Sequence, residues 1–98
     1  MDTSECLFCK IAKGELPSTK IYEDDTIVAF EDKFPIAPVH FLVIPKVHVE
    51  TLDDVREEHS EVLAHMLLKG AELAREKGVA EEGYRQVINC REQGGQII

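Results

Sequence analysis

The stretch FEDKFPIAPVHFLVIPKVH, residues 30–48, joins a loop to an apolar strand. Residues 32–38 include two prolines, which favour a loop, and residues 40–44 are nearly all apolar up to the stop at Pro45. A histidine stands at each end of the expected strand, His40 and His48. From residue chemistry alone, His40 is either a core histidine satisfied by one hydrogen bond or part of a site built where a loop meets a strand.

The segments on both sides of this stretch predict further strands. Residues 20–23 and 26–30 are expected to form a hairpin, with the acidic run Glu23-Asp24-Asp25 as its turn. Residues 85–90 predict a fourth strand, and the residues from Gln96 onward predict a fifth. Together these strands would make an antiparallel meander.

Two helices are expected beside the strands. Ser4 can cap a short helix over residues 6–12, and residues 53–78 form a long helical region that ends at Gly78. Apolar or small residues recur in the long region at i, i+3, i+4 and i+7 spacing, and this stripe comprises Val62, Leu63, Met66, Leu67, Gly70, Ala71 and Ala74. Helices that flank an antiparallel meander make an α+β fold, expected here as a single domain over residues 1–98.

The composition restricts the classes of partner. The 98 residues carry a formal net charge of −8, and nonspecific nucleic-acid binding requires a basic face. No apolar run approaches the roughly 18 residues that span a bilayer, and no basic-then-apolar leader stands at the N-terminus. The three cysteines favour thiols or a metal over disulfides. We therefore expect a soluble, cytoplasmic domain that binds neither nucleic acid nor a membrane.

Cys6 and Cys9 are three residues apart on the expected short helix. This spacing supplies half of a zinc site, because the two thiolates then lie at nearby positions. A thioredoxin-like redox pair would need a strand before the helix, and none is predicted there. From the residues alone, metal ligation and inert thiols are both open.

Several short motifs, taken in their order and spacing, resemble the histidine triad family and specifically its Hint branch of purine nucleoside phosphoramidase-like proteins. These motifs cover nearly the whole chain and comprise Cys6-Leu7-Phe8-Cys9-Lys10-Ile11, Ile21-Tyr22-Glu23-Asp24-Asp25, Ala29-Phe30-x-Asp32, Ala37-Pro38-x-His40-Phe41-Leu42-Val43-Ile44-Pro45-Lys46, Gly83-Tyr84-Arg85 and Gly94-Gly95-Gln96. The resemblance implies a HIT-like fold, which is a five-stranded antiparallel meander with one long and one short helix. In this chain the last strand would be truncated.

The family binds nucleotides and cleaves bonds at their α-phosphate, so the resemblance also implies site residues. Asp32 would accept hydrogen bonds from the ribose hydroxyls, and His40 would be the triad-associated histidine that orients the catalytic one. The base would lie in an apolar slot lined by Phe8, Ile11, Leu16 and Phe30, with Lys33 also against it. The α-phosphate would face Asn89 and the backbone of Gly95, Gln96 and Ile97. Core packing is the alternative for the apolar slot.

The implied reaction has two steps. A histidine nitrogen attacks phosphorus and an amine or other group leaves, and water then hydrolyses the nucleotidyl-histidine. The family's His-x-His-x-His-x-x strand should follow Gly94-Gly95-Gln96-Ile97-Ile98 almost at once, and the 98 residues do not contain it. We expect the ending to cut through the site, so that a polypeptide ending at Ile98 is catalytically inactive.

The resemblance further implies zinc and a second copy of the chain. Some bacterial members with the cysteine pair carry a histidine at the position of His48 and hold structural zinc through all three, with the first histidine of the signature strand as the fourth ligand. Cys6, Cys9 and His48 are therefore the expected ligands within these residues, for a structural zinc in the complete protein. Relatives are homodimers, and a purine nucleotide such as AMP or GMP is the expected small-molecule partner. Two alternatives are a noncatalytic protein that binds nucleotides or partners, and a zinc-stabilised structural module.

Overall fold

The computed structural model of this chain describes residues 19–49, 51–88, 90 and 93. The chain divides into two compact units, residues 1–48 and 49–98. The expected short helix over residues 6–12 and the expected strand from Gln96 lie outside the described residues. Among the described helices, none has the length and apolar character needed to cross a bilayer.

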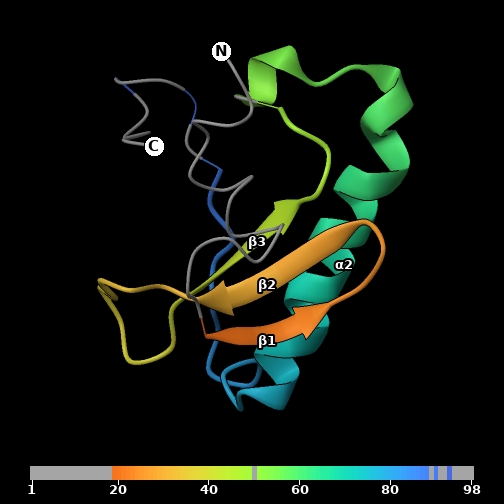
Figure 1. Ribbon diagram of the computed structural model, residues 1–98. Helices are drawn as coiled ribbons and strands as arrows, with labels where there is room; N and C mark the ends of the chain where they lie inside the picture. The colour runs from red at the N-terminus through yellow and green to blue at the C-terminus, as the bar shows by residue number, and fades with distance from the viewer. Residues whose placement is uncertain (1–18, 50, 89, 91–92, 94–98) are drawn as a thin grey trace. The chain divides into compact units, whose positions relative to one another are not determined.

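The first unit contains an antiparallel sheet of three described strands in the order β1-β2-β3 (Figure 1). The strands are β1 (Lys20–Glu23), β2 (Ile27–Glu31) and β3 (Phe41–Pro45). The β2–β3 register pairs Val28 with Ile44, and β1 pairs with β2 through an irregular step between Lys20 and Tyr22. The predicted hairpin is confirmed. The strands β2 and β3 each begin and end one residue later than expected.

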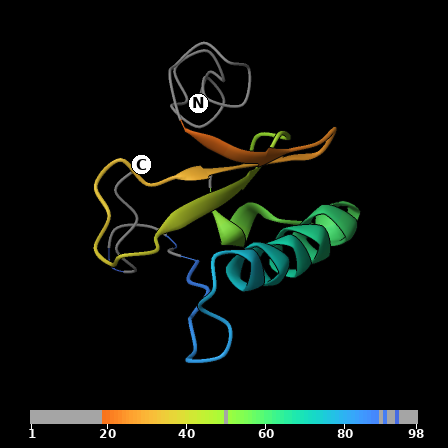
Figure 2. The same ribbon diagram turned by 90° about the horizontal axis from the view of Figure 1, so that it is seen from below.

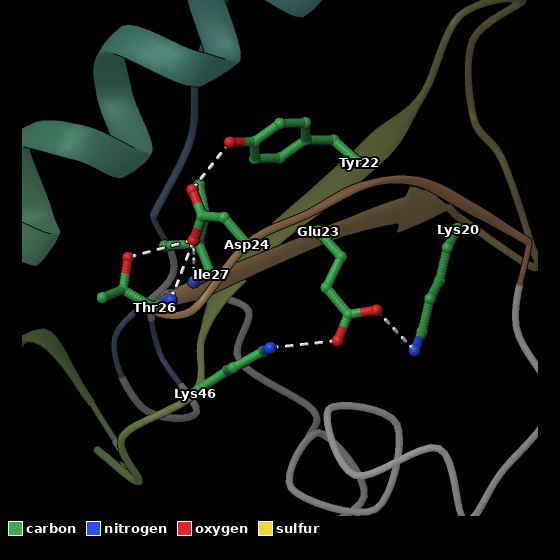
Figure 3. Close-up of polar contacts among 7 residues, drawn as sticks. All are labelled: Lys20, Tyr22, Glu23, Asp24, Thr26, Ile27 and Lys46. Atoms are coloured by element: carbon green, nitrogen blue, oxygen red, sulfur yellow. Dashed lines mark hydrogen bonds and ion pairs between the residues drawn. The ribbon is translucent and has the colours of Figure 1, made fainter.

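Asp24 organises the turn between β1 and β2. Its Oδ1 atom accepts hydrogen bonds from the backbone N–H groups of Thr26 (2.8 Å) and Ile27 (2.9 Å), and its Oδ2 atom accepts one from the Tyr22 hydroxyl (2.7 Å). A short carboxylate that binds backbone amides two and three residues ahead is a common way to close a turn. This arrangement ends β1 at Glu23 and starts β2 at Ile27 (Figure 3).

The core of the first unit lies on β2. Successive side chains of a strand point to opposite faces, and on β2 the side chains of both faces are buried. One face carries a hydrophobic cluster of Val28, Phe30 and Ile44, with Leu42 packed against it. Ile27 and Ala29, which alternate with these residues, are fully buried as well. A strand without an exposed face explains why residues 27–30 are all apolar.

Glu23 lies between two lysines at the surface of the sheet (Figure 3). Its carboxylate oxygens are 3.0 Å from Nζ of Lys46 and 3.1 Å from Nζ of Lys20. The hydrogen bond from Lys46, and then the one from Lys20, hold the pKa of this carboxyl below its ordinary value of 4.5. A lowered carboxyl pKa means that the folded chain favours the charged form.

We expect this cluster to make a small, pH-dependent contribution to stability. Because the pKa of Glu23 is lowered on folding, the contribution is present above pH 4.5 and is lost as pH falls through the folded-state value. Glu23→Gln should therefore lower the melting temperature slightly at pH 7 and leave it unchanged in strong acid. Thermal melts of both proteins across pH test this, with the exposed Glu81→Gln as a matched control. A Glu23→Gln deficit that persists at low pH would contradict it.

The second unit contains the long helix α2 (Ser60–Glu76), which is continuous along its length (Figure 2). Two 3-10 turns, Leu52–Asp54 and Glu57–His59, precede it. The second turn continues directly into α2, so the expected region 53–78 is interrupted at residues 55 and 56. Side chains account for the interruption. The Arg56 N–H donates to Nδ1 of His59 (3.0 Å), and the Thr51 hydroxyl donates to Asp54 (2.7 Å).

The helix α2 ends close to Gly78, where the sequence predicted the end of the helical region. This glycine has a φ of 80°, a left-handed conformation that side chains disfavour. Its N–H donates to the carbonyl of Arg75, and the N–H of Val79 donates to the carbonyl of Ala74. These two bonds form a Schellman motif, which satisfies carbonyls left over at a helix end.

The predicted stripe of α2 is confirmed in part. Gly70 and Ala74 are buried and Leu73 joins the buried set, whereas the charged residues Glu61, Glu72 and Arg75 are exposed. Leu67 is instead 43% exposed. Gly70 lies against Gln86, whose side-chain Nε2 donates to the carbonyl of Leu67 at 3.1 Å.

This contact makes a specific prediction for Gly70→Ala. The new Cβ would lie 2.9 Å from Oε1 of Gln86, so the Gln86 side chain must move and its hydrogen bond, worth about 0.5–1.5 kcal/mol, is lost. Alanine gains about 1 kcal/mol of helix propensity over glycine, so the net change in the free energy of unfolding should be close to zero. In a Gln86→Ala background the same substitution should stabilise by about 1 kcal/mol.

Urea unfolding of the two single variants and the double variant measures these free energies. If Gly70→Ala destabilises strongly in both backgrounds, Gln86 is not the group that limits this position.

The prediction of a fourth strand at residues 85–90 is wrong for those of its residues that the structure describes. Residues 85–88 and Cys90 are not in a strand. A strand needs a partner for its backbone groups, and the described residues of the second unit contain no other strand. The β-branched residues Val87 and Ile88 that suggested a strand are 61% and 50% exposed.

Candidate functional site

The loop between β2 and β3 brings together the two residues that the sequence singled out, Asp32 and His40. Asp32 follows the last residue of β2, and His40 precedes the first residue of β3. The N–H of Asp32 donates to the carbonyl of His40 at 3.1 Å, so the antiparallel pairing of the strands continues to the base of the loop. The loop extends beyond the ends of both strands (Figure 1).

The side chains of the two residues also meet. Nε2 of His40 lies 3.2 Å from Oδ2 of Asp32, and both side chains are about a quarter exposed. Nδ1 of His40 accepts a hydrogen bond from the backbone N–H of Ile36 at 3.1 Å. An imidazole nitrogen that accepts carries no proton, so the proton of the neutral ring is on Nε2, which faces the carboxylate.

The other carboxylate oxygen of Asp32 is held by the loop. Oδ1 accepts a hydrogen bond from the backbone N–H of Phe34 at 2.8 Å. Asp32 therefore has one oxygen fixed by a backbone amide and the other by an imidazole. A carboxylate held in this way keeps lone pairs for further donors and is suited to bind hydroxyl groups.

Two other predicted nucleotide-binding residues of the first unit are described, Phe30 in β2 and Lys33 in the loop. Phe30 is 4% exposed and belongs to the hydrophobic cluster, which fits the core-packing alternative, and its contact with a base stays a prediction. Lys33 is exposed in the loop. The sequence reasoning did not single out Phe34 and Ile36, which are 78% and 83% exposed although both are large and apolar.

The remaining predicted residues lie outside the described part of the chain. These are Cys6, Phe8, Cys9, Ile11, Leu16, Asn89, Gly95, Gln96 and Ile97. Of the expected zinc ligands the structure thus describes His48 alone, which lies shortly after β3 with its Nε2 atom buried. Within the described residues, no three His, Cys, Asp or Glu side chains are grouped so that they could hold a metal ion.

Comparisons with known proteins identify the family. A family profile described as "Scavenger mRNA decapping enzyme C-term binding" matches residues 5–95. The purine nucleoside phosphoramidase of Escherichia coli K12 is 42% identical over 94 residues, which are 96% of this chain and 79% of that protein. The crystal structure of a HIT family hydrolase from Legionella pneumophila superposes with a TM-score of 0.94 at 49% identity and covers 96% of this chain and 84% of that one. The chain belongs to the histidine triad family.

Membership confirms the expected α+β, HIT-like fold and shows that the chain resembles HIT family hydrolases. Some members of the family bind zinc. A 14 kDa zinc-binding protein of Zea mays is 42% identical over 100 residues, which span all of this chain and 77% of that protein. A zinc-bound histidine triad protein from Mycobacterium smegmatis superposes with a TM-score of 0.82 at 33% identity, over 99% of this chain and 70% of that one.

Proposed function

We propose that this chain forms the nucleotide-binding part of a hydrolase that acts at the α-phosphate of purine nucleoside phosphoramidates or related nucleotides. The observation that carries the proposal is the Asp32–His40 pair, in which a carboxylate is oriented where the β2–β3 loop leaves the sheet. The 42% identity to a purine nucleoside phosphoramidase supports the choice of substrate class.

The proposed binding mode assigns the ribose to Asp32, whose carboxylate would accept hydrogen bonds from vicinal hydroxyls. The base would lie by Phe8, Phe30 and Lys33, since an aromatic ring and a lysine stem both offer apolar contact. The α-phosphate would face Asn89 and the backbone of Gly95, Gln96 and Ile97, where N–H groups can bind an anion.

The proposed chemistry is nucleotidyl transfer to histidine and then to water. A neutral histidine nitrogen forms a bond to phosphorus while the P–N bond to the amine breaks and the amine leaves with a proton. Water then attacks phosphorus, and the histidine leaves. None of the chain's four histidines is proposed as the nucleophile, because the family's nucleophile belongs to a His-x-His-x-His run and this sequence has none.

The activity test uses the gene product at its native length and adenosine 5′-phosphoramidate. We expect release of AMP and ammonia, with a nucleotidyl-histidine trapped by mass spectrometry after quenching without acid. A polypeptide of residues 1–98 alone should bind AMP and form no such adduct. If the gene product at native length binds AMP but does not hydrolyse adenosine 5′-phosphoramidate, the noncatalytic alternative is supported. If it does not bind AMP, the proposal is contradicted altogether.

We propose structural zinc as a separate feature, held by Cys6, Cys9 and His48. Thiolates and imidazole are zinc's preferred ligands, and His48 presents a buried ring nitrogen close to the end of β3. Metal analysis of the unchelated gene product at its native length should find about one zinc per chain, and under roughly a tenth would contradict the proposal. Chelation should also lower the melting temperature, because a structural metal contributes to folding free energy.

We also propose a homodimer, whose interface would include exposed apolar side chains of the second unit. Leu68, Val87 and Ile88 are 70%, 61% and 50% exposed, and exposed apolar groups commonly mark interfaces. Sedimentation equilibrium tests the oligomeric state. The cytoplasmic location stays a prediction from the charge and cysteine content.

A further inference from the structure

The loop between β2 and β3 is held by polar contacts and not by burial. Residues 33–38 are all exposed, and its two large apolar side chains, Phe34 and Ile36, have 78% and 83% of their surface in contact with solvent. Apolar packing stabilises a segment in proportion to the area it removes from water, so packing contributes little here. The position of this loop must depend on its hydrogen bonds.

Those hydrogen bonds converge on two side chains. Asp32 accepts from the Phe34 N–H at 2.8 Å, and His40 accepts from the Ile36 N–H at 3.1 Å. The two side chains then contact each other at 3.2 Å, and the Asp32 N–H donates to the His40 carbonyl at 3.1 Å. His40 is thus linked both to the middle of the loop and to the carboxylate at its start.

Both ring nitrogens of His40 are engaged by this arrangement. Nδ1 accepts from Ile36, and Nε2, which therefore carries the proton of the neutral ring, faces Asp32. In the family role expected from sequence, the same histidine would give a hydrogen bond to the catalytic histidine. With Nε2 directed at a carboxylate, that role would require the contact with Asp32 to break.

The contacts that Phe34 and His40 make with Asp32 leave some lone pairs of its carboxylate available to accept further hydrogen bonds. Its two oxygens offer about four lone-pair positions, of which Phe34 takes one and His40 takes one. The two that are left lie on different oxygens of one rigid group. A pair of acceptors at fixed separation suits a vicinal diol, which is the group that a ribose presents.

We propose that His40 is a positioning residue for Asp32, which it orients to receive the two ribose hydroxyls of the nucleotide. This inference rests on the proposed function, in which Asp32 binds the ribose. His40 acts through two separable contacts: its Nε2–H orients the carboxylate, and its Nδ1 fixes the exposed loop that carries the Phe34 amide. The expected consequence is that His40 contributes to nucleotide affinity and not solely to the chemical step.

The test measures AMP affinity by calorimetry in the protein and its variants. His40→Ala should weaken binding about tenfold, because two hydrogen-bonding contacts are lost. His40→Gln keeps a donor at the position of Nε2, and His40→Asn keeps an acceptor at the position of Nδ1. Each should therefore weaken binding by about threefold. His65→Gln in α2 is the matched histidine control and should bind as the unaltered protein does.

A double-variant cycle decides between the two roles. If His40 acts through Asp32, then His40→Ala should weaken AMP binding by less than about twofold once Asp32→Asn is present. Multiplicative losses in the double variant, or unchanged AMP affinity in His40→Ala, would overturn the inference. In that case the role of orienting a catalytic histidine is favoured.

A second readout does not depend on the nucleotide. Nitrogen chemical shifts of the neutral His40 ring should show an unprotonated Nδ1 and a protonated Nε2, and the Ile36 amide should exchange faster in His40→Gln than in the unaltered protein. The reverse tautomer would contradict the inference directly. If AMP does not bind the unaltered protein, the proposed function fails and the positioning role fails with it, whatever the ring shifts show.

Discussion

Replacing Asp32 with asparagine is expected to weaken AMP binding by roughly 10- to 100-fold, because hydrogen bonds to a charged acceptor are worth about 1.5–3 kcal/mol. Asparagine can still accept the Phe34 N–H through its own oxygen, so the turn at the start of the loop should be kept. Its amide nitrogen would then face Nε2 of His40, which places one donor against another.

The effect of Asp32→Asn should appear in the dissociation constant measured by calorimetry and leave the melting temperature nearly unchanged. Asp25→Asn is the matched control, since it removes one exposed carboxylate from the turn between β1 and β2. If both variants bind AMP equally well, Asp32 does not contact the ribose. If Asp32→Asn unfolds the protein, the carboxylate serves the fold instead.

Phe30→Ala is expected to destabilise the protein by about 3–5 kcal/mol, the cost typical of deleting a buried aromatic side chain. Phe30 is 4% exposed and packs with Val28 and Ile44 in the cluster on β2. Small domains have about 5–15 kcal/mol of total stability. The loss should therefore lower the melting temperature by more than about 12 °C, as thermal melts followed by circular dichroism can show.

Phe34→Ala is the matched control, because it deletes the same atoms from a side chain that is 78% exposed. It should change the free energy of unfolding by less than about 0.5 kcal/mol. Equal losses in the two variants would contradict the assignment of Phe30 to the core. Phe30→Leu, which keeps much of the volume, then tests the base contact: weaker AMP binding in a folded Phe30→Leu protein supports a dual role.

The strands of the first unit could be predicted closely because their signals are local. The acidic turn at residues 23–25 marked the hairpin of β1 and β2, and an apolar run that stops at Pro45 marked β3; β1 has the limits that were expected. The one-residue shift at the start of β2 arises from Asp24, which binds the backbone amide of Thr26 and holds that residue in the turn. Such an end depends on one side-chain rotamer, which a sequence pattern does not specify.

The expectation of a strand at residues 85–90 failed, in the described residues 85–88 and Cys90, for a different reason. β-Branched residues favour a strand only where a neighbouring strand is available, and local sequence does not say which segments become neighbours. In the structure Gln86 instead reaches back to the carbonyl of Leu67 on α2. A residue 19 positions away thus determines how this segment is held.

The sequence was enough to identify residues of the site, but not the contacts between them. Asp32 and His40 were each singled out, whereas their meeting at 3.2 Å depends on how a loop with two prolines closes. The Ile36 amide that fixes the tautomer of His40 is a backbone group, and no side-chain pattern reports it. The exposure of Phe34 and Ile36 likewise follows from the course of the loop.

The nucleotide site is tested most directly by titrating the isotope-labelled protein with AMP and following amide chemical shifts. We predict saturable changes that are largest at Asp32, Phe34, Ile36 and His40 among the described residues, with small changes along α2. An absence of saturable changes, or changes concentrated at residues 60–76, would contradict the placement of the ribose at Asp32.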